Sequence, residues 1–233
     1  GKAVATLQRV ESTSRDWGAR RLVRSCQVAI SVIHDEYGHS VESALAVLDV
    51  ADAEFPNVAD LTNQRSKVLF HAKREQEALA VAERALSFQG LSNVEYVFTC
   101  RNAGIAAANL GSWVKAVDFF ELGAKRASQS RIQEPMGIGL MADAAIGYWK
   151  QGKPQESISK FVEVLELLDS IPFADDIKLR QLHATVRHCI SWIHFEAAQE
   201  RSEQLADPRP GMCSNQDPHE GIKDHRIVDI AAA

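Results

Sequence analysis

The fold is decided by residues 102–127, which read NAGIAAANLGSWVKAVDFFELGAKRA. Apolar residues recur at helical spacing on both sides of Gly111, so the segment predicts two helices joined by a tight turn. Small residues, Gly104 and Ala116, stand inside the two predicted helices, and bulky Phe120 follows one turn later. Small side chains let two helix backbones approach closely, and a bulky one fills the groove beside them. The segment therefore predicts a closely packed helix pair.

The same unit recurs along the chain. A small residue opens the second helix of each pair, and successive copies are separated by 34, 38 and 41 residues, at Ala44, Ala78, Ala116 and Ser157. We expect the extra residues in the turns between pairs, such as Ser128–Glu134, and one extra residue in the turn of the first pair. An irregular helical bundle, whose alanines only mark crowded interfaces, is the alternative.

A helix–turn–helix period of 34 residues is that of the tetratricopeptide repeat (TPR), and the chain resembles this family over about residues 20–170. The residues that carry the resemblance are Ala44, Ala51 and Pro56 in the first pair, Ser66, Leu69, Ala78 and Ala85 in the second, Gly104, Ala116, Phe120 and Gly123 in the third, and Ala145, Tyr148, Ser157 and Phe161 in the fourth. Val164 departs from the pattern, which has a small residue there. The resemblance implies an all-α fold, a right-handed α-solenoid of about four TPR-like helix pairs with extra terminal helices.

The helix signals divide the chain into four parts. Residues 1–16 are expected to form an N-terminal helix or the remnant of a preceding repeat, and residues 17–172 the repeat array. A long capping helix is expected in residues 173–206, and a polar linker with the start of a truncated helix in residues 207–233. The first residue is not Met and the last residues are apolar, so we expect a fragment of a longer protein, with Gly1 and Ala231–Ala233 as cloning remnants.

Composition excludes several classes of function. The formal charge is −5 and the pI near 5.9, which disfavours direct nucleic-acid binding. No apolar run approaches the ~20 residues of a membrane span, and the N-terminus does not resemble a signal peptide. The four cysteines are far apart and contain no CxxC pair, which predicts free thiols in a reducing compartment, hence a cytoplasmic protein.

The sequence predicts no catalytic residue, no metal site and no cofactor. His183, His188 and His194 are separated by five and six residues, which places them on different faces of a helix, whereas helical metal ligands need spacings of three or four. The acidic pairs Asp35–Glu36 and Asp175–Asp176 are interpreted as solvated charge. The glycines of MGIGLMADAAIG, residues 136–147, are interpreted as close-packing positions inside a helix.

The resemblance implies that the first helix of each pair lines a concave groove, which binds a peptide or helix of another protein. Its residues here are Asn63, Lys67, Phe70 and His71 from the second pair, Phe98, Arg101, Ile105 and Asn109 from the third, and Ile146, Trp149 and Lys150 from the fourth. Aromatic and cationic side chains together suit an acidic–aromatic segment. The predicted function is a non-catalytic protein–protein interaction module, as a scaffold or sensor arm of a larger intracellular protein.

Two alternatives stay open. The array could be the homodimerisation module of a signalling ATPase or transcription regulator, joined through its outer faces or its last helix. It could also be a helical enzyme or small-ligand-binding domain built around Tyr148, Trp149 and the histidines of Leu182–His194, which requires a closed, deep cavity.

Overall fold

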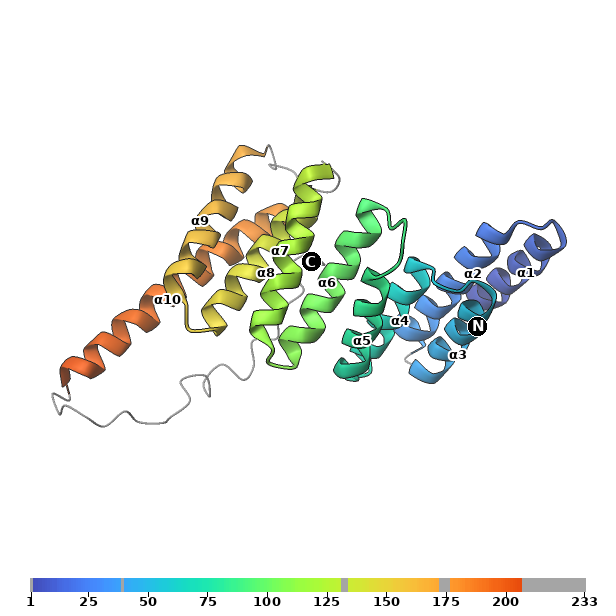
Figure 1. Ribbon diagram of the computed structural model, residues 1–233, viewed down its shortest axis with the longest axis horizontal. Helices are drawn as coiled ribbons and strands as arrows, with labels where there is room; N and C mark the ends of the chain where they lie inside the picture. The colour runs from blue at the N-terminus through green and yellow to red at the C-terminus, as the bar shows by residue number, and fades with distance from the viewer. Residues whose placement is uncertain (1, 39, 131–133, 172–176, 207–233) are drawn as a thin grey trace. The chain divides into compact units, whose positions relative to one another are not determined.

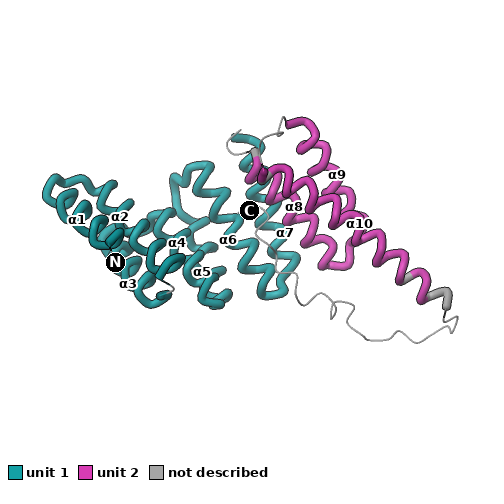
Figure 2. The backbone as a smooth tube through the Cα atoms, turned by 180° about the vertical axis from the view of Figure 1, so that it is seen from behind, with its two compact units in different colours: residues 1–132 teal, residues 133–233 magenta. Residues whose placement is uncertain are grey.

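The computed structural model describes residues 2–38, 40–130, 134–171 and 177–206. These residues form helices joined by turns, with no strand among them (Figure 1). The chain divides into two compact units, residues 1–132 and 133–233 (Figure 2). The predicted linker in residues 207–233 lies outside the described residues.

The first unit contains three helix pairs preceded by one helix, and the second contains the fourth pair followed by a long helix. The elements of the first unit are α1 (Lys2–Asp16), α2 (Arg20–Val32), the π-helical segment η1 (Ile33–Tyr37), α3 (Val41–Glu54), α4 (Ala59–His71), α5 (Glu75–Leu86), α6 (Asn93–Asn109) and α7 (Trp113–Ser130). Those of the second are α8 (Glu134–Lys150), α9 (Pro154–Ser170) and α10 (Ile177–Ala206). The all-α paired architecture predicted from the sequence is confirmed.

The two helices of a pair are joined where their small residues meet, twelve positions apart in the sequence. In α4–α5 the Ser66 hydroxyl donates to the Ala78 carbonyl at 3.0 Å. In α8–α9 the Ser157 hydroxyl donates to the Ala145 carbonyl at 2.7 Å, so the same bond runs in the opposite direction. These buried bonds satisfy the hydroxyl groups and hold the helix backbones together.

The turn inside a pair also repeats. Gly111 and Gly152 have φ angles of 72° and 73° and lie five residues before the small residue of the second helix. In α4–α5 the same position is held by Lys73, with φ of 60°. Left-handed backbone is readily adopted by glycine and rarely by lysine. The turn geometry is therefore imposed by the packing of the pair, with or without glycine.

The prediction that extra residues lie in the turns between pairs is only partly right. The turn between α5 and α6, residues 87–92, is longer than the turn between α3 and α4, residues 55–58, but most of the added length is in the helices. Helix α6 has 17 residues where α4 has 13, and α7 has 18 where α5 has 12. Ser128 and Ser130, which were predicted to lie in a turn, belong to α7. Lengthening a helix by a turn adds packing and intrahelical hydrogen bonds, whereas lengthening a turn adds only chain to be ordered.

The extra residue of the first pair is absorbed in its first helix rather than in its turn. Helix α2 continues into η1, where the Gly38 amide donates to the Ile33 carbonyl at 2.9 Å, an i to i+5 bond. A π-helical turn holds one residue more than an α-helical turn and reorients the side chains around it. Two of these side chains, Asp35 and Glu36, take part in the candidate site.

Local sequence signals mark several helix starts. Ser92 accepts from the Glu95 amide and the Glu95 carboxylate accepts from the Ser92 amide, so a capping box opens α6. Pro135 and Pro154 both lie in first helical turns. The last helix begins at Ile177, and the Asp175–Asp176 pair lies outside the described residues.

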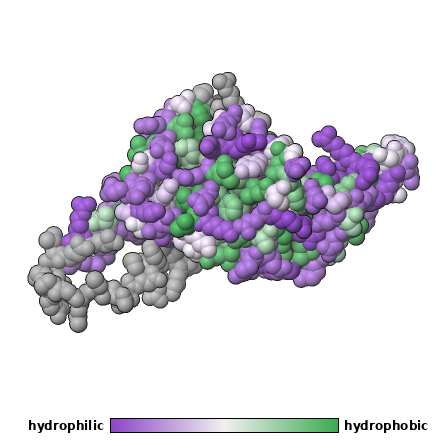
Figure 3. All heavy atoms as spheres, in the orientation of Figure 1, coloured by the Kyte–Doolittle hydropathy of each residue, from purple (hydrophilic) through white to green (hydrophobic). Residues whose placement is uncertain are grey.

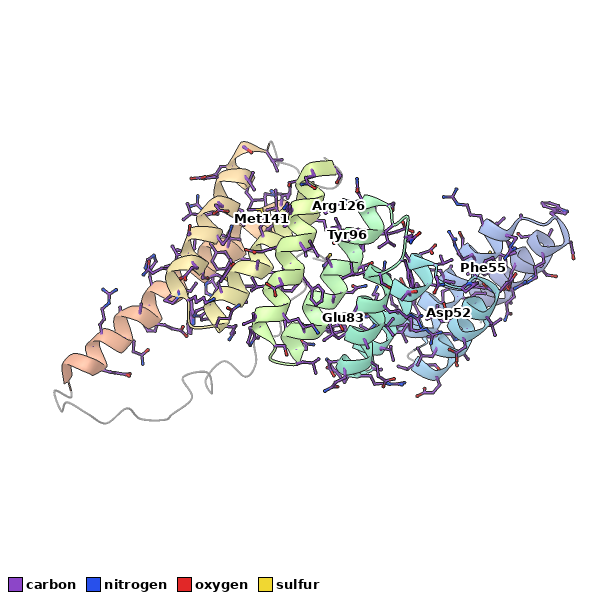
Figure 4. All side chains as sticks on the ribbon, viewed as in Figure 1. Asp52, Phe55, Glu83, Tyr96, Arg126 and Met141 are labelled. Atoms are coloured by element: carbon purple, nitrogen blue, oxygen red, sulfur yellow. The ribbon has the colours of Figure 1, made fainter. Side chains whose placement is uncertain are left out.

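Neighbouring helices of the first unit are also linked by charged side chains on their surfaces (Figure 4). Arg65 contacts Asp52 at 2.8 Å, which joins α4 to α3, and Lys115 contacts Glu83 at 2.5 Å, which joins α7 to α5. The Arg126 guanidinium lies 5.2 Å from the centre of the Tyr96 ring. Each exposed pair contributes only about 0–1 kcal/mol, so the apolar interiors carry most of the stability.

Each unit has its own apolar core. One buried cluster in the first unit contains Val23, Ala44, Leu48, Ala51, Phe55, Leu61 and Val68. The cluster in the second unit contains Ile138, Ala142, Ala145, Phe161, Val164, Leu168, Leu179, Leu182, Val186 and Ile193, with Met141 packed against it. Hydrophilic side chains cover much of the face in view, and hydrophobic residues reach it in patches (Figure 3).

Replacing Gly104 by Ala is expected to destabilise the protein. A Cβ atom at this position would overlap the Phe120 ring, which is 1% exposed. Overpacking costs about 1–3 kcal/mol, and the higher helix propensity of Ala returns about 1 kcal/mol. Urea unfolding followed by circular dichroism should show a lower midpoint. Phe120→Leu should offset part of the loss in the double variant. An unchanged or higher midpoint for Gly104→Ala would contradict the close approach.

Candidate binding face on the first helices

Helices α2, α4 and α6, the first helices of the three pairs in the first unit, are neighbours along the unit. We call their accessible surface the first-helix face. Eight of the eleven residues predicted for the groove lie on α4 and α6, namely Asn63, Lys67, Phe70, His71, Phe98, Arg101, Ile105 and Asn109. The other three, Ile146, Trp149 and Lys150, lie on α8 in the second unit.

Asn63 connects α4 to α6. Its side-chain oxygen lies 2.9 Å from the Thr99 hydroxyl, and its backbone carbonyl accepts from the Asn102 amide group at 3.4 Å. The Thr99 hydroxyl also lies 2.7 Å from the Glu95 carbonyl, so its single proton serves one acceptor at a time. Thr99 is fully buried, and bonds shielded from water are the more effective at fixing two helices.

The cations of the face have partners within the protein. The Lys67 ammonium lies 2.6 Å from the Glu36 carboxylate of η1. Arg101 is also engaged in interactions of its own. An acidic group that approaches Lys67 would therefore compete with Glu36, a pairing that the sequence does not reveal.

The interpretation of Asp35–Glu36 as solvated charge is wrong for Asp35, whereas Glu36 is exposed. Asp35 is buried, and its carboxylate lies 2.8 Å from the Nδ1 atom of His71, the last residue of α4. The π-helical turn sets both acidic side chains toward α4, and a short-range sequence pattern does not reveal such a turn. These two residues therefore belong to the candidate site and join the first pair to the second.

Three apolar members of the face, Phe70, Phe98 and Ile105, are half-buried, and Asn109 is exposed. The centre of the Phe70 ring lies 5.9 Å from that of the His71 ring and 5.6 Å from the Lys73 ammonium. On α6, Phe98, Arg101, Ile105 and Asn109 follow at intervals of three and four residues, so they share one side of the helix. Phe70, Phe98 and Ile105, which we call the apolar strip, thus lie among polar groups of the first-helix face.

The three residues in the second unit form a separate cluster. The Trp149 indole donates to the Glu196 carboxylate of α10 at 3.1 Å, and the Lys150 ammonium lies 4.7 Å from the Trp149 ring centre. Burial lowers the pKa of Lys150, while the negative charge of Glu196 acts in the opposite direction. Glu196 was not predicted, because its spacing from Trp149 depends on how α10 folds back.

The described residues can be compared with the requirements of a metal site, a reactive cysteine and a membrane span. They contain no cluster of three His, Cys, Asp or Glu side chains suited to a metal ion. Burial raises the pKa of Cys26 and Cys189, and raises that of Cys100 to about 12, so the reactive thiolate is disfavoured at neutral pH. None of the described helices is both long and apolar enough to span a membrane.

Comparison with known proteins supports the fold. No protein-family model matches the sequence, and no curated protein matches it. The solved structure of MamA is similar with a TM-score of 0.54 and 16% identity, covering 75% of this chain and 97% of that one. The chain has a TPR-like fold. A thermophilic TPR protein of Thermus thermophilus, TTC0263, aligns over 78% of this chain and 98% of its own with 16% identity, but a TM-score of 0.49 adds no support.

Removal of His71 is expected to destabilise the first TPR-like pairs. In His71→Ala the buried Asp35 carboxylate loses its partner, which costs about 1–3 kcal/mol. Urea unfolding should show the loss, and Asp35→Ala added to His71→Ala should cost less than the two single effects combined. His188→Ala, an exposed histidine on α10, is the control and should change stability by less than about 0.5 kcal/mol. Equal effects of the two histidine variants would contradict the role of this pair.

Proposed function

We propose that the protein is a non-catalytic interaction module whose first-helix face binds a peptide or helix of another protein. The observation that carries the proposal is the apolar strip of Phe70, Phe98 and Ile105, left half-buried beside fixed polar groups. Central apolar anchors within a polar border are typical of protein-binding surfaces.

The hydrogen bonds of Asn63 support this proposal because they tie α4 to α6 before any partner arrives. A surface that is already ordered loses less conformational entropy on binding than a mobile one. The Asp35–His71 and Glu36–Lys67 pairs do the same between η1 and α4. The apolar strip is thus held on a prearranged support.

The paired cations narrow the expected chemistry of the partner. Because Glu36 already neutralises Lys67, an acidic group of the partner gains less here than at an unpaired lysine. We expect aromatic or aliphatic side chains of the partner to supply most of the affinity, and acidic ones to set its orientation. An acidic–aromatic segment fits this description.

The cellular setting that we propose is a reducing, cytoplasmic one, with the module acting as a scaffold or sensor arm. Cys26, Cys100 and Cys189 are free, and the first two are buried. Free thiols of this kind are typical of reducing compartments.

Partner capture tests the proposal directly. The tagged protein is compared with Phe98→Ala/Ile105→Ala by affinity purification from an extract of the source cells, with quantitative mass spectrometry. The control is Val114→Ala/Leu122→Ala, which removes exposed apolar groups from α7, the second helix of the same pair. Loss of two central anchors should lower capture of the specific partner about tenfold or more.

Circular dichroism must show both variants folded at the temperature of capture. Equal capture by Phe98→Ala/Ile105→Ala and by the unaltered protein would remove the first-helix face from consideration. Loss of capture only in the α7 control would place the binding surface on the second helices.

Self-association is a second candidate, favoured by the exposed Val50 of α3 and Val114 and Leu122 of α7 on second helices. Multi-angle light scattering should then give a dimer mass that falls to the monomer mass in Val114→Ala/Leu122→Ala. A monomer mass for the unaltered protein at high micromolar concentration would reject this candidate.

A further inference from the structure

The last helix carries an aromatic surface that its own unit does not cover. Val186 and Ile193 of α10 are buried in the core of the second unit, whereas Trp192 is 38% and Phe195 59% exposed. Figures 1 and 2 show the C-terminal half of α10 extending beyond α8 and α9. The aromatic residues therefore lie where the helix leaves the core of its unit.

One carboxylate lies at the centre of this surface. Glu196 accepts from the Trp192 indole at 2.8 Å through Oε1 and from the Trp149 indole at 3.1 Å through Oε2. Two neutral donors leave the negative charge of the carboxylate in place, and each oxygen keeps a further lone pair. Glu196 is consequently a fixed, partly accessible acceptor held between two tryptophans.

The protein already places a cation on one of these tryptophans. The Lys150 ammonium lies 4.7 Å from the centre of the Trp149 ring, close to the indole that bonds to Glu196. Trp192 has the same bond to the same carboxylate, and its ring lies 5.8 Å from the Phe195 ring at an interplanar angle of 40°. Tilted aromatic faces beside a carboxylate attract planar cations, guanidinium above all.

The surrounding charges extend this preference along the helix. Trp192, Phe195 and Gln199 are spaced by three and four residues, so they lie on one side of α10. The Gln199 side-chain amide donates to the Glu203 carboxylate at 3.0 Å. His188, four residues before Trp192, lies at the other end of this side of α10. A basic segment is therefore favoured at the Glu196–Glu203 end.

We propose that Trp192, Phe195 and Glu196 form a docking site for an arginine side chain of a basic segment in a partner protein. The guanidinium stacks on the exposed face of Trp192, contacts the Phe195 edge and donates to Glu196. This α10 site shares no residue with the first-helix face. An experiment can therefore reject binding at one of the two surfaces without rejecting binding at the other.

A pair of designed peptides tests the α10 site. The probe is a fluorescein-labelled alanine-rich helical peptide with three arginines four residues apart, and the comparison peptide carries glutamates in their place. Fluorescence anisotropy should show at least about tenfold tighter binding of the arginine peptide, and Trp192→Ala/Phe195→Ala should remove about tenfold of its affinity.

Matched variants separate this site from general charge attraction. Glu196→Gln keeps the size of the side chain and should weaken binding several-fold, whereas Glu166→Gln on α9 and the exposed Trp17→Ala should leave it within about twofold. Phe195→Ala alone, at a residue with little burial, should weaken binding even if Trp192→Ala disturbs the helix.

Three results would overturn the proposal. The first is equal affinity for the arginine and glutamate peptides, and the second is an equal effect of Glu196→Gln and Glu166→Gln. The third is a dimer in light scattering that Trp192→Ala/Phe195→Ala converts to monomer, because the occupant would then be a second copy of this chain.

Discussion

The close approach of the two helices within a pair is the constraint on which the other features of this protein depend. Where Gly104 meets Phe120, an extra methyl group has no room. Where Ser66 meets Ala78 and Ser157 meets Ala145, a hydroxyl crosses directly to the opposite backbone. These contacts set the distance between helices, and the turn must then accept a left-handed residue even when that residue is Lys73.

The sides of the first helices that do not pack within a pair are available for contacts with neighbouring pairs. Their polar residues pair mainly with the neighbouring first helix, as Asn63 does with Thr99 and Asp35 with His71. Such bonds specify how one pair follows the next and hold the half-buried apolar residues at fixed positions. The π-helical segment η1 is a local departure from the repeat that brings two acidic side chains into this seam.

In the second unit, the long helix α10 takes part both in the core and in a surface contact. The helix completes the core with one side and returns Glu196 to the Trp149 indole of α8 with another. The carboxylate also fixes Trp192 on the exposed side of the helix. One acidic residue thus links the internal packing of the unit to the exposed aromatic side chains of α10.

Local patterns in the sequence determined the helices, the pairing of small residues twelve positions apart and the capping box at Ser92, because each depends on residues close in the chain. The TPR-like fold followed from their repetition. Only the tertiary structure decided where the longer repeats absorb their extra residues, that Asp35 is buried against His71, and that Glu196 joins two tryptophans. The Asp35–His71 and Trp149–Glu196 contacts join residues 36 and 47 positions apart, and the first depends on a π-helical turn. Their partners were therefore set by packing between helices, which no local pattern records, whereas Trp192 and Glu196 are four residues apart on one helix.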